Sequence, residues 1–308
     1  MGYSIPIVVT GANGFVGRHV VRRLVQDGHQ VSTITRSGVC DVEGVSNSIR
    51  GDLEADSPNP DWFRDKEILI HLAGKISGLP SDIPVEQSVN VRMARQLIAG
   101  INGAAIQKTI VLSSISASPD NIHDGGKNRY SREKAATDEV FLEQMLPNRN
   151  MLFLRPPAIY GPGMKGGIAP LFKMTAKGLP VPLGLAAVPR PYLSVRNLAD
   201  LMSHIVVADD EAWEKCNRKF IEVHDGELVA TNTLVRYIAA AQGKKARLLP
   251  IPAGVLRAVA KVLHKADMVS GALDPVVIEQ SALLQDCFDW APVEKMPDSL
   301  KFSSASVT

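Results

Sequence analysis

The stretch Thr10–Gly17, TGANGFVG, follows a short apolar run and leads into the helix that we expect over Phe15–Asp27. Its glycines Gly11, Gly14 and Gly17 have the spacing G-x-x-G-x-x-G, not the G-x-G-x-x-G of the commonest dinucleotide fingerprint. Glycine permits a tight bend and a close backbone approach to a ligand, and the amides at a helix N-terminus attract phosphate. The stretch therefore predicts a pyrophosphate site, with a plain strand-to-helix turn as the alternative.

Segments typical of strands and of helices alternate outward from this turn, as in a parallel, doubly wound, Rossmann-like α/β sheet. Strands are expected over Ile5–Thr10, Gln30–Arg36, Ser46–Gly51, Glu67–Ala73, Lys108–Ser113 and Met151–Arg155, and helices over Phe15–Asp27, Glu86–Ile101 and Ser131–Met145. We assign residues 1–160 to a dinucleotide-binding domain.

The composition of the sequence changes after Arg155. The stretch RPPAIYGPGMKGG is rich in Pro and Gly and indicates a loop-bearing junction. Residues 161–308 are expected to form mainly a smaller C-terminal lobe, with some segments returning to the main sheet. Short strands are expected in it at Phe220–His224 and Arg247–Leu249.

The composition narrows the class of protein. The 308 residues are 45% hydrophobic with a net charge of +2. The sequence contains no Lys/Arg-rich run, so a nucleic-acid partner is not expected. Cys40, Cys216 and Cys287 lie far apart and form no C-x-x-C, which argues against a disulfide framework or a zinc site and favours a cytoplasmic location. No metal is expected. No apolar run approaches the roughly 18 residues of a membrane span, and nothing marks secretion.

A helix expected over Ala253–His264 is amphipathic. Its apolar stripe contains Val255, Leu256, Val259, Val262 and Leu263, and Arg257, Lys261 and Lys265 lie elsewhere on the helix. Such a basic amphipathic helix can lie on a membrane surface. Packing onto the core or onto a neighbouring subunit is the preferred interpretation, because apolar stripes of this kind are the norm for surface helices.

The end of the second strand bears on the cofactor. An acidic residue there accepts hydrogen bonds from the adenosine ribose and repels a 2′-phosphate. The strand ends in Thr35-Arg36-Ser37, without a carboxylate, and Arg36 can pair with a 2′-phosphate. We therefore favour NADP(H), with NAD(H) possible. The GDL at Gly51–Leu53 ends the third strand and places Asp52 within reach of the adenine amino group.

The chemical signal is the Y-x-x-x-K of Tyr130 and Lys134 at the start of a helix. Residues at i and i+4 share a helical face, so the ammonium can approach the phenol. A nearby cation favours the phenolate and lowers the pKa of tyrosine toward a useful range. Ser114, at the end of a strand, can donate a hydrogen bond to a substrate oxygen.

Together these motifs resemble the extended short-chain dehydrogenases/reductases, in the group of nucleotide-sugar epimerases, dehydratases and reductases. The resemblance covers nearly the whole chain. It rests on TGANGFVG, the GDL, HLAG at His71–Gly74, NV at Asn90–Val91, LSS, YSREK, RPPAIYGPG at Arg155–Gly163 and RPYLSVRNLAD at Arg190–Asp200.

The resemblance implies the roles of the site residues. Tyr130 is the general acid/base, Lys134 tunes it and contacts the nicotinamide ribose, and Ser114 polarises the substrate oxygen. The implied cofactor contacts are Gly11, Asn13, Gly14, Phe15, Val16, Gly17, Arg36, Asp52, Leu53, Leu72, Ala73, Gly74, Asn90, Tyr130, Lys134 and Pro157; the implied substrate contacts are Ser114, Lys165 and Arg190. It further implies a nucleotide-sugar substrate, bound in part by the C-terminal lobe, and a homodimer formed through the helices at Glu86–Ile101 and Ser131–Met145.

Several positions depart from the pattern of the family. Ser114 and Tyr130 are only 16 positions apart, so the loop SASPDNIHDGGKN is shortened. Glu133 replaces the usual serine before the lysine, and Asn197 stands where an aspartate is usual. Arg155-Pro-Pro replaces the arginine–x–asparagine of typical hexose epimerases.

These features leave alternative functions. Sugar dehydration is disfavoured because Ile115-Ser116 supplies no carboxylate after Ser114. We favour C4-keto reduction of a UDP-4-keto-6-deoxy-N-acetylhexosamine in surface-polysaccharide synthesis, because the RPPAIYGPG and LPVPLG stretches resemble such reductases and NADPH suits reduction. A UDP-hexose or N-acetylhexosamine 4-epimerase is the alternative. A non-catalytic NAD(P)-binding sensor or scaffold is the alternative from another class.

Overall fold

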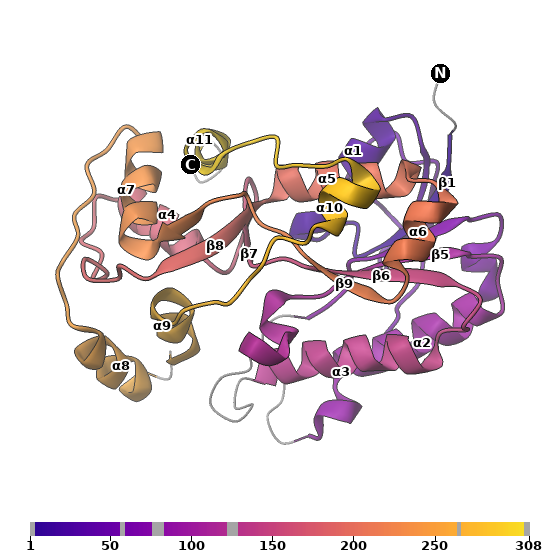
Figure 1. The fold of residues 1–308 in the computed structure, drawn as a ribbon, viewed down its shortest axis with the longest axis horizontal. Helices are drawn as coiled ribbons and strands as arrows, with labels where there is room; N and C mark the ends of the chain where they lie inside the picture. The colour runs from indigo at the N-terminus through magenta and orange to yellow at the C-terminus, as the bar shows by residue number, and fades with distance from the viewer. Residues whose placement is uncertain (1–3, 56–58, 76–82, 122–128, 264–265, 305–308) are drawn as a thin grey trace. The chain divides into compact units, whose positions relative to one another are not determined.

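The computed structural model describes residues 4–55, 59–75, 83–121, 129–263 and 266–304 (Figure 1). The chain divides into two compact units, and each unit is assembled from three segments. The first unit comprises Met1–Arg155, Leu198–Val223 and Gln280–Ala291, and the second comprises Pro156–Asn197, His224–Glu279 and Pro292–Thr308.

The first unit is built on a seven-stranded sheet in the order β3-β2-β1-β4-β5-β6-β9, in which every pairing is parallel. The order reverses beside β1, as in doubly wound sheets, so the Rossmann-like prediction is confirmed. The strands are β1 (Pro6–Thr10), β2 (Gln30–Thr35), β3 (Asn47–Arg50), β4 (Ile68–His71), β5 (Lys108–Leu112), β6 (Asn150–Arg155) and β9 (Lys219–Glu222).

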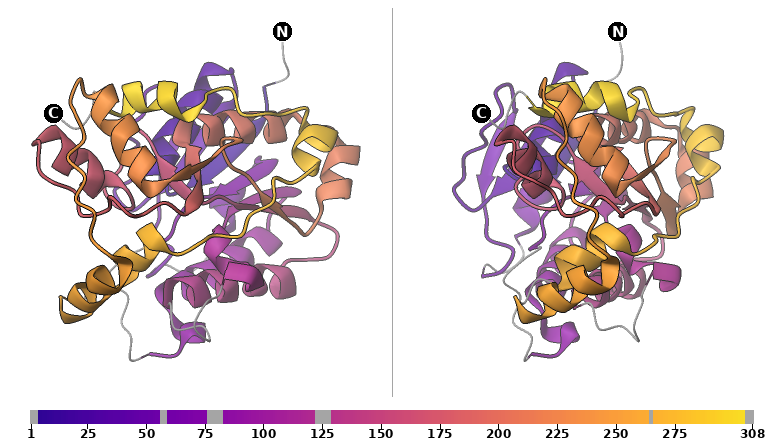
Figure 2. Two further views of the ribbon diagram at one scale, coloured as in Figure 1. Left: turned by 60° about the vertical axis from the view of Figure 1, so that its left-hand side comes forward. Right: turned by 90° about the vertical axis from the view of Figure 1, so that its left-hand side faces the viewer.

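Helices cover both faces of this sheet (Figures 1 and 2). On one face, α2 (Val89–Asn102) and α3 (Arg129–Gln144) bury Leu97 and Phe141 in a core cluster with strand residues such as Leu69 and Phe153. The other helices of this unit are α1 (Phe15–Gln26), most of α5 (Val195–Val207), α6 (Asp210–Cys216) and α10 (Leu283–Phe288). Continuous apolar strands such as β1 are therefore buried on both sides, as parallel sheets require.

The second unit contains a three-stranded sheet in the order β10-β8-β7. Its strands are β7 (Ala158–Tyr160), β8 (Pro189–Ser194) and β10 (Leu228–Ala230), and its helices are α4 (Ala169–Ala176), α7 (Thr231–Ala241), α8 (Ala253–Val262), α9 (Ala266–Leu273) and α11 (Met296–Ser304). None of the helices that the structure describes is long and apolar enough to cross a bilayer.

The loop-bearing junction predicted after Arg155 also contains the short strand β7, which pairs in parallel with β8. One local prediction in the second unit is wrong. The strand expected at Arg247–Leu249 forms only an isolated bridge, between Val181 and Leu248. Pro250 and Pro252 follow this bridge, and because proline donates no backbone hydrogen bond they prevent its extension.

A buried polar network explains one departure from the family pattern. The Asp225 carboxylate accepts hydrogen bonds from Tyr160 Oη at 2.7 Å, Ser194 N at 2.9 Å and Asn197 Nδ2 at 2.7 Å. Burial raises the pKa of Asp225 to about 6. An aspartate at position 197 would place a second carboxylate against the first, so the amide of Asn197 suits this site better.

Candidate active site

The glycine turn between β1 and α1 is packed so closely that side chains are excluded from it. Gly11 has φ of 75°, and a Cβ there would lie 2.6 Å from Ala73 N in the chain that follows β4. A Cβ on Gly17 would lie 2.1 Å from Gly11 O. The turn at Gly11 is therefore packed between the backbone of HLAG on one side and the first turn of α1 on the other.

The N-terminus of α1 is open to an acceptor. Its N-cap is Gly14, which has no side chain, and the first turn contains no acidic residue. The Asn13 side chain is used elsewhere, donating to Val39 O at 2.8 Å and accepting from Asp41 N at 3.0 Å. Free first-turn amides at a helix dipole fit the pyrophosphate of a dinucleotide, and the residues present are therefore suited to that cofactor.

The end of β2 forms a tight turn around one carbonyl. Thr35 Oγ1 and Ser37 Oγ donate to Val39 O at 3.1 and 3.2 Å, and Arg36 between them is exposed. The nearby Asp41 carboxylate pairs with Arg18 at 2.8 Å. The guanidinium at this strand end therefore extends into solvent beside a turn that is stabilised without a carboxylate.

Asp52 and Leu53 follow the third strand, β3. One carboxylate oxygen of Asp52 accepts from Glu54 N at 3.0 Å, which fixes the side chain in a local turn. Leu53 is buried, and Trp62 lies so close to Gly51 that a Cβ there would be 2.6 Å from the indole. The adenine contacts expected of Asp52 and Leu53 remain predictions.

His71 at the end of β4 is a structural residue. Its Nδ1 lies 2.8 Å from Thr10 Oγ1, and its ring packs on Phe141 with centroids 5.5 Å apart. Burial, together with the charge of Lys134, lowers the pKa of His71 to about 3. The imidazole is therefore neutral and joins β1 to β4.

The three predicted catalytic residues come from β5 and α3. Tyr130 and Lys134 lie one turn apart at the start of α3, and Ser114 is the N-cap of a 3-10 helix, Ile115–Ala117, directly after β5. Lys134 Nζ donates to Leu112 O, the last residue of β5, at 2.9 Å. The lysine thereby fixes the first turns of α3 at the carboxyl end of β5, which is where ligands bind in doubly wound sheets.

Asn90 brings the loop after β4 to the same place. A Cβ on Gly74 would lie 3.8 Å from Asn90 Oδ1 and 3.9 Å from Lys134 Nζ. Asn90 also clamps Lys75, accepting from its N at 2.8 Å and donating to its O at 2.9 Å. Gly74, Asn90 and Lys134 therefore meet at the carboxyl ends of β4 and β5.

A buried ion pair behind Asn90 was missed in the sequence. Glu133 is fully buried; its Oε2 accepts from Asn90 Nδ2 at 3.2 Å and its Oε1 from Arg129 Nε at 2.6 Å. Arg129 donates further to Ile83 O at 2.8 Å. The available signal was the Arg–Glu pair at i and i+4 directly before Lys134, at the position where the family has serine.

A second buried cluster, also missed, supports the end of β5. Asp138 Oδ2 accepts from Ser113 Oγ at 2.7 Å and from Arg155 Nη2 at 3.1 Å. Arg155 also stacks over Phe220, 3.6 Å from the ring centroid. The arginine that opens RPPAIYGPG therefore pairs inside the first unit and orients the residue next to Ser114.

Three of the predicted contacts belong to the second unit. Pro157 is buried before β7, Lys165 is exposed, and Arg190 lies on β8. Burial lowers the pKa of Arg190, and its Nη1 has no hydrogen-bond partner among the described residues. The shortened loop before Tyr130 falls largely on residues 122–128, outside the described residues.

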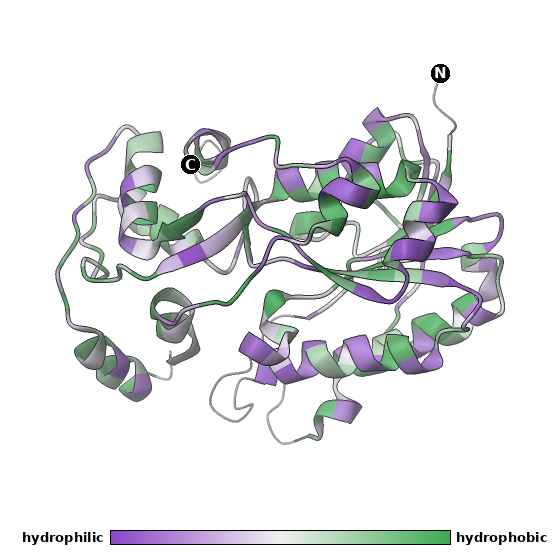
Figure 3. Cartoon of the chain, in the orientation of Figure 1, coloured by the Kyte–Doolittle hydropathy of each residue, from purple (hydrophilic) through white to green (hydrophobic). Residues whose placement is uncertain are grey.

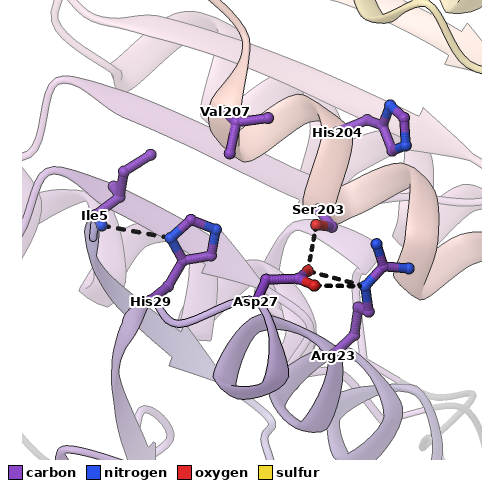
Figure 4. Close-up of a pocket in the computed structure, with 7 residues that line it drawn as sticks. All are labelled: Ile5, Arg23, Asp27, His29, Ser203, His204 and Val207. Atoms are coloured by element: carbon purple, nitrogen blue, oxygen red, sulfur yellow. Dashed lines mark hydrogen bonds and ion pairs between the residues drawn. The ribbon is translucent and has the colours of Figure 1, made fainter. Parts of the chain in front are cut away.

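A separate hollow of about 460 Å³ lies between α1 and α5 (Figure 4). Ile5 and His29, which precede β1 and β2, place it at the amino ends of the strands, away from the predicted catalytic residues. Ser203 Oγ donates to Asp27 there at 2.5 Å. The lining residues are Ile5, Arg23, Asp27, His29, Ser203, His204 and Val207. Over the described part of the chain, no three His, Cys, Asp or Glu side chains gather as a metal ion would require.

Comparison with known proteins agrees with this arrangement. The model of the NAD dependent epimerase/dehydratase family matches residues 7–217. A UDP-glucose 4-epimerase from Vibrio cholerae is 25% identical over 316 residues, covering 96% of this chain and 93% of its own. An N-acetyl-α-D-glucosaminyl-diphospho-ditrans,octacis-undecaprenol 4-epimerase from Escherichia coli O157:H7 is 22% identical over 273 residues, 81% of this chain and 77% of its own.

The fold is shared with the solved structure of MoeE5 in complex with UDP-glucuronic acid and NAD. Its TM-score is 0.76 at 20% identity, with 98% of both chains covered. The residues matched by the family model include the glycine turn, Ser114, Tyr130 and Lys134, and the fold brings Lys134 to the carboxyl ends of β4 and β5. The chain therefore belongs to the NAD-dependent epimerase/dehydratase family, and it is an enzyme of the short-chain dehydrogenase/reductase type.

Proposed function

We propose that this enzyme reduces the C4 keto group of a UDP-4-keto-6-deoxy-N-acetylhexosamine, with NADPH as the reductant, in the synthesis of surface polysaccharide. The observation that carries the proposal is Arg36, exposed at the end of β2 where no carboxylate is present. A guanidinium at this position attracts a 2′-phosphate, and an acidic residue would repel it. NADPH is held largely reduced in cells, so a preference for it favours reduction.

The glycine turn and the start of α1 would hold the pyrophosphate, and Lys134 and Asn90 would hold the nicotinamide end. When bound, the dinucleotide supplies the hydride that the reaction needs. The other residues proposed to contact the dinucleotide are Asn13, Phe15, Val16, Asp52, Leu53, Leu72, Ala73 and Pro157.

Side chains of the protein would transfer the proton that the reduction needs. Tyr130 would donate its phenolic proton to the sugar oxygen as the carbonyl becomes an alcohol. The Lys134 ammonium, held at 2.9 Å from Leu112 O, would stabilise the phenolate that remains. Ser114 Oγ, now 2.9 Å from Ser116 Oγ, would turn its hydrogen to the substrate oxygen.

In the second unit, Arg190 is assigned to the diphosphate of the substrate and Lys165 to the same ligand. Support comes from Arg190 Nη1, a donor without a partner in the described part of the chain, and a guanidinium is suited to two phosphate oxygens. The proposed dimer forms through α2 and α3.

The second candidate is a 4-epimerase that uses NAD. Both curated relatives described above are 4-epimerases by name, and one of them aligns with 96% of this chain. An epimerase keeps its cofactor and needs no external reductant, whereas a reductase consumes one NADPH in each cycle. This difference decides the test.

The test follows NADPH absorbance in the presence of a UDP-4-keto-6-deoxy-N-acetylhexosamine. We expect consumption of NADPH, loss of about 10²-fold or more in kcat for Tyr130→Phe, and no such loss for the control Tyr237→Phe on α7. Arg36→Glu should shift the preference toward NADH. Interconversion of C4-epimeric UDP sugars without added reductant would establish the epimerase instead, and full activity of Tyr130→Phe would overturn both assignments.

A further inference from the structure

Helix α8 exposes most of its apolar side chains. Within this chain the core covers only one edge of the predicted stripe: in α8 only Ala260 is buried and Leu256 is partly buried, so the expected packing onto a neighbouring subunit stays a prediction. Val255, Val259 and Val262 are 52%, 52% and 78% exposed. Exposing several apolar side chains together on one helix is unfavourable in water. Such a patch therefore indicates a surface that binds a partner or a membrane.

The exposed residues form one line along the helix. Val255, Val259 and Val262 follow the spacing i, i+4, i+7, whereas Leu256 and Ala260 form the neighbouring edge that packs inward. Leu263, 58% exposed, continues the line. Figures 1 and 3 show α8 beside α9, carrying hydrophobic and hydrophilic residues on the same short helix. We call Val255, Val259, Val262 and Leu263 the apolar line.

Positive charge is concentrated in the stretch of sequence that contains this line. Seven of the 34 Lys and Arg residues, and none of the 32 Asp and Glu residues, fall between Leu228 and Ala266. The rest of the chain is therefore acidic on balance, although the whole chain has a net charge of +2. The seven are Arg236, Lys244, Lys245, Arg247, Arg257, Lys261 and Lys265, of which Lys265 lies outside the described residues.

We propose that α8 docks the enzyme on the surface of an anionic lipid bilayer. The apolar line would enter the boundary between headgroups and acyl chains, with the helix lying in the plane of the surface. Lys261 and the other basic residues of this segment would contact the anionic headgroups. This surface lies outside the machinery of the proposed reaction, and the proposal does not depend on that reaction.

The charge pattern selects the bilayer over other occupants. A two-fold contact between α8 helices of two copies would bring Lys261 against its own equivalent, and the segment has no acidic residue to compensate it, whereas Arg257 is already paired with Asp274 at 2.5 Å. A nucleic-acid backbone would satisfy the charges but would leave the apolar line in water. An anionic bilayer satisfies both features.

The test is co-sedimentation of the full chain with vesicles. We expect binding to vesicles of phosphatidylcholine mixed with phosphatidylglycerol, weak binding to phosphatidylcholine alone, and loss of binding at high salt. The variant Val255→Gln/Val259→Gln/Val262→Gln should reduce the partition coefficient at least about tenfold. Lys261→Glu, on α8 itself, should reduce it about fivefold or more. The exposed side chains and the helix propensity of glutamine leave folding intact.

The matched control is Val293→Gln, at a valine that is 71% exposed and lies outside the segment. It should bind vesicles as the unmodified chain does, and circular dichroism should show the same fold for every variant. Failure to bind anionic vesicles, or binding that the glutamine variant retains in full, would overturn the proposal. Self-association that the glutamine variant abolishes, without vesicle binding, would assign α8 to a second copy instead.

Discussion

His71 is a single residue whose burial couples stability to pH. Its pKa is about 3 in the folded chain and about 6.5 when exposed. The unfolded chain therefore binds the additional proton, and the stabilisation is complete above pH 6.5 and is lost as the pH falls toward 3. Between pH 7 and pH 5 we expect this residue to remove about 2 kcal/mol from the free energy of unfolding.

Urea unfolding at the two pH values measures this effect. His71→Gln should show a smaller loss between pH 7 and pH 5 than the unmodified chain, whatever its stability at pH 7. His204→Gln is the control, because the His204 side chain is 40% exposed. Equal pH dependence in the unmodified chain and His71→Gln would show that His71 does not titrate in this way.

The start of α3 acts as one element through its buried ion pair. Glu133 holds both Arg129 and Asn90, and Asn90 holds the loop at Lys75 beside Gly74. Glu133→Gln leaves the Arg129 charge buried without its partner, so we expect unfolding to require about 3 kcal/mol less. We also expect weaker dinucleotide binding, because Asn90 loses its anchor. Thermal denaturation and cofactor titration by tryptophan fluorescence measure the two effects.

A double variant separates stability from positioning. Arg129→Met/Glu133→Leu removes both charges and should recover stability, because apolar replacement of a buried ion pair is often neutral or stabilising. Dinucleotide binding should stay weak, since Asn90 remains without its anchor. Recovery of both would show that Glu133 only stabilises the fold. Asp61→Asn, at an exposed pair with Arg64, should change neither by more than about 0.5 kcal/mol.

Local signals made α3 and the glycine turn predictable, because strand, turn and helix are adjacent in sequence there. The turn at Gly11 and the Tyr130–Lys134 spacing each lie within a short stretch of sequence. Nothing local indicated that Glu133 would be buried or that it would reach Asn90, 43 positions away. The same holds for Asn197, whose role depends on Asp225 in a distant segment.

At the scale of the whole molecule, the contacts that the sequence could not predict are those between residues far apart in the chain. Cys216 and Cys287 are 71 positions apart, and nothing in the sequence indicates that they are neighbours. In the structure α6 and α10 bring them together, and burial with the Cys287 hydrogen bond raises the pKa of Cys216 to about 12. The seven-stranded sheet likewise takes its last strand from residues far beyond the first six.

That last strand has a consequence for how the protein is made. β9 covers the edge of β6, and Ser281 N donates to Glu222 O at 3.2 Å at the end of β9. A fragment of residues 1–160 would leave β6 as an open edge, which is a template for aggregation. We expect that fragment to be insoluble when expressed alone, and to be partly rescued by co-expression with residues 161–308. A soluble, monomeric fragment with native circular dichroism would contradict this.

The same connection governs folding during translation. Trp290 Nε1 donates to Asp200 Oδ2 at 2.8 Å, so the first unit gains its final contacts only after Trp290 has left the ribosome. A domain that is complete early can fold while synthesis continues. Here the nascent sheet must wait, and in that interval its exposed edge makes the unfinished polypeptide a client for chaperones.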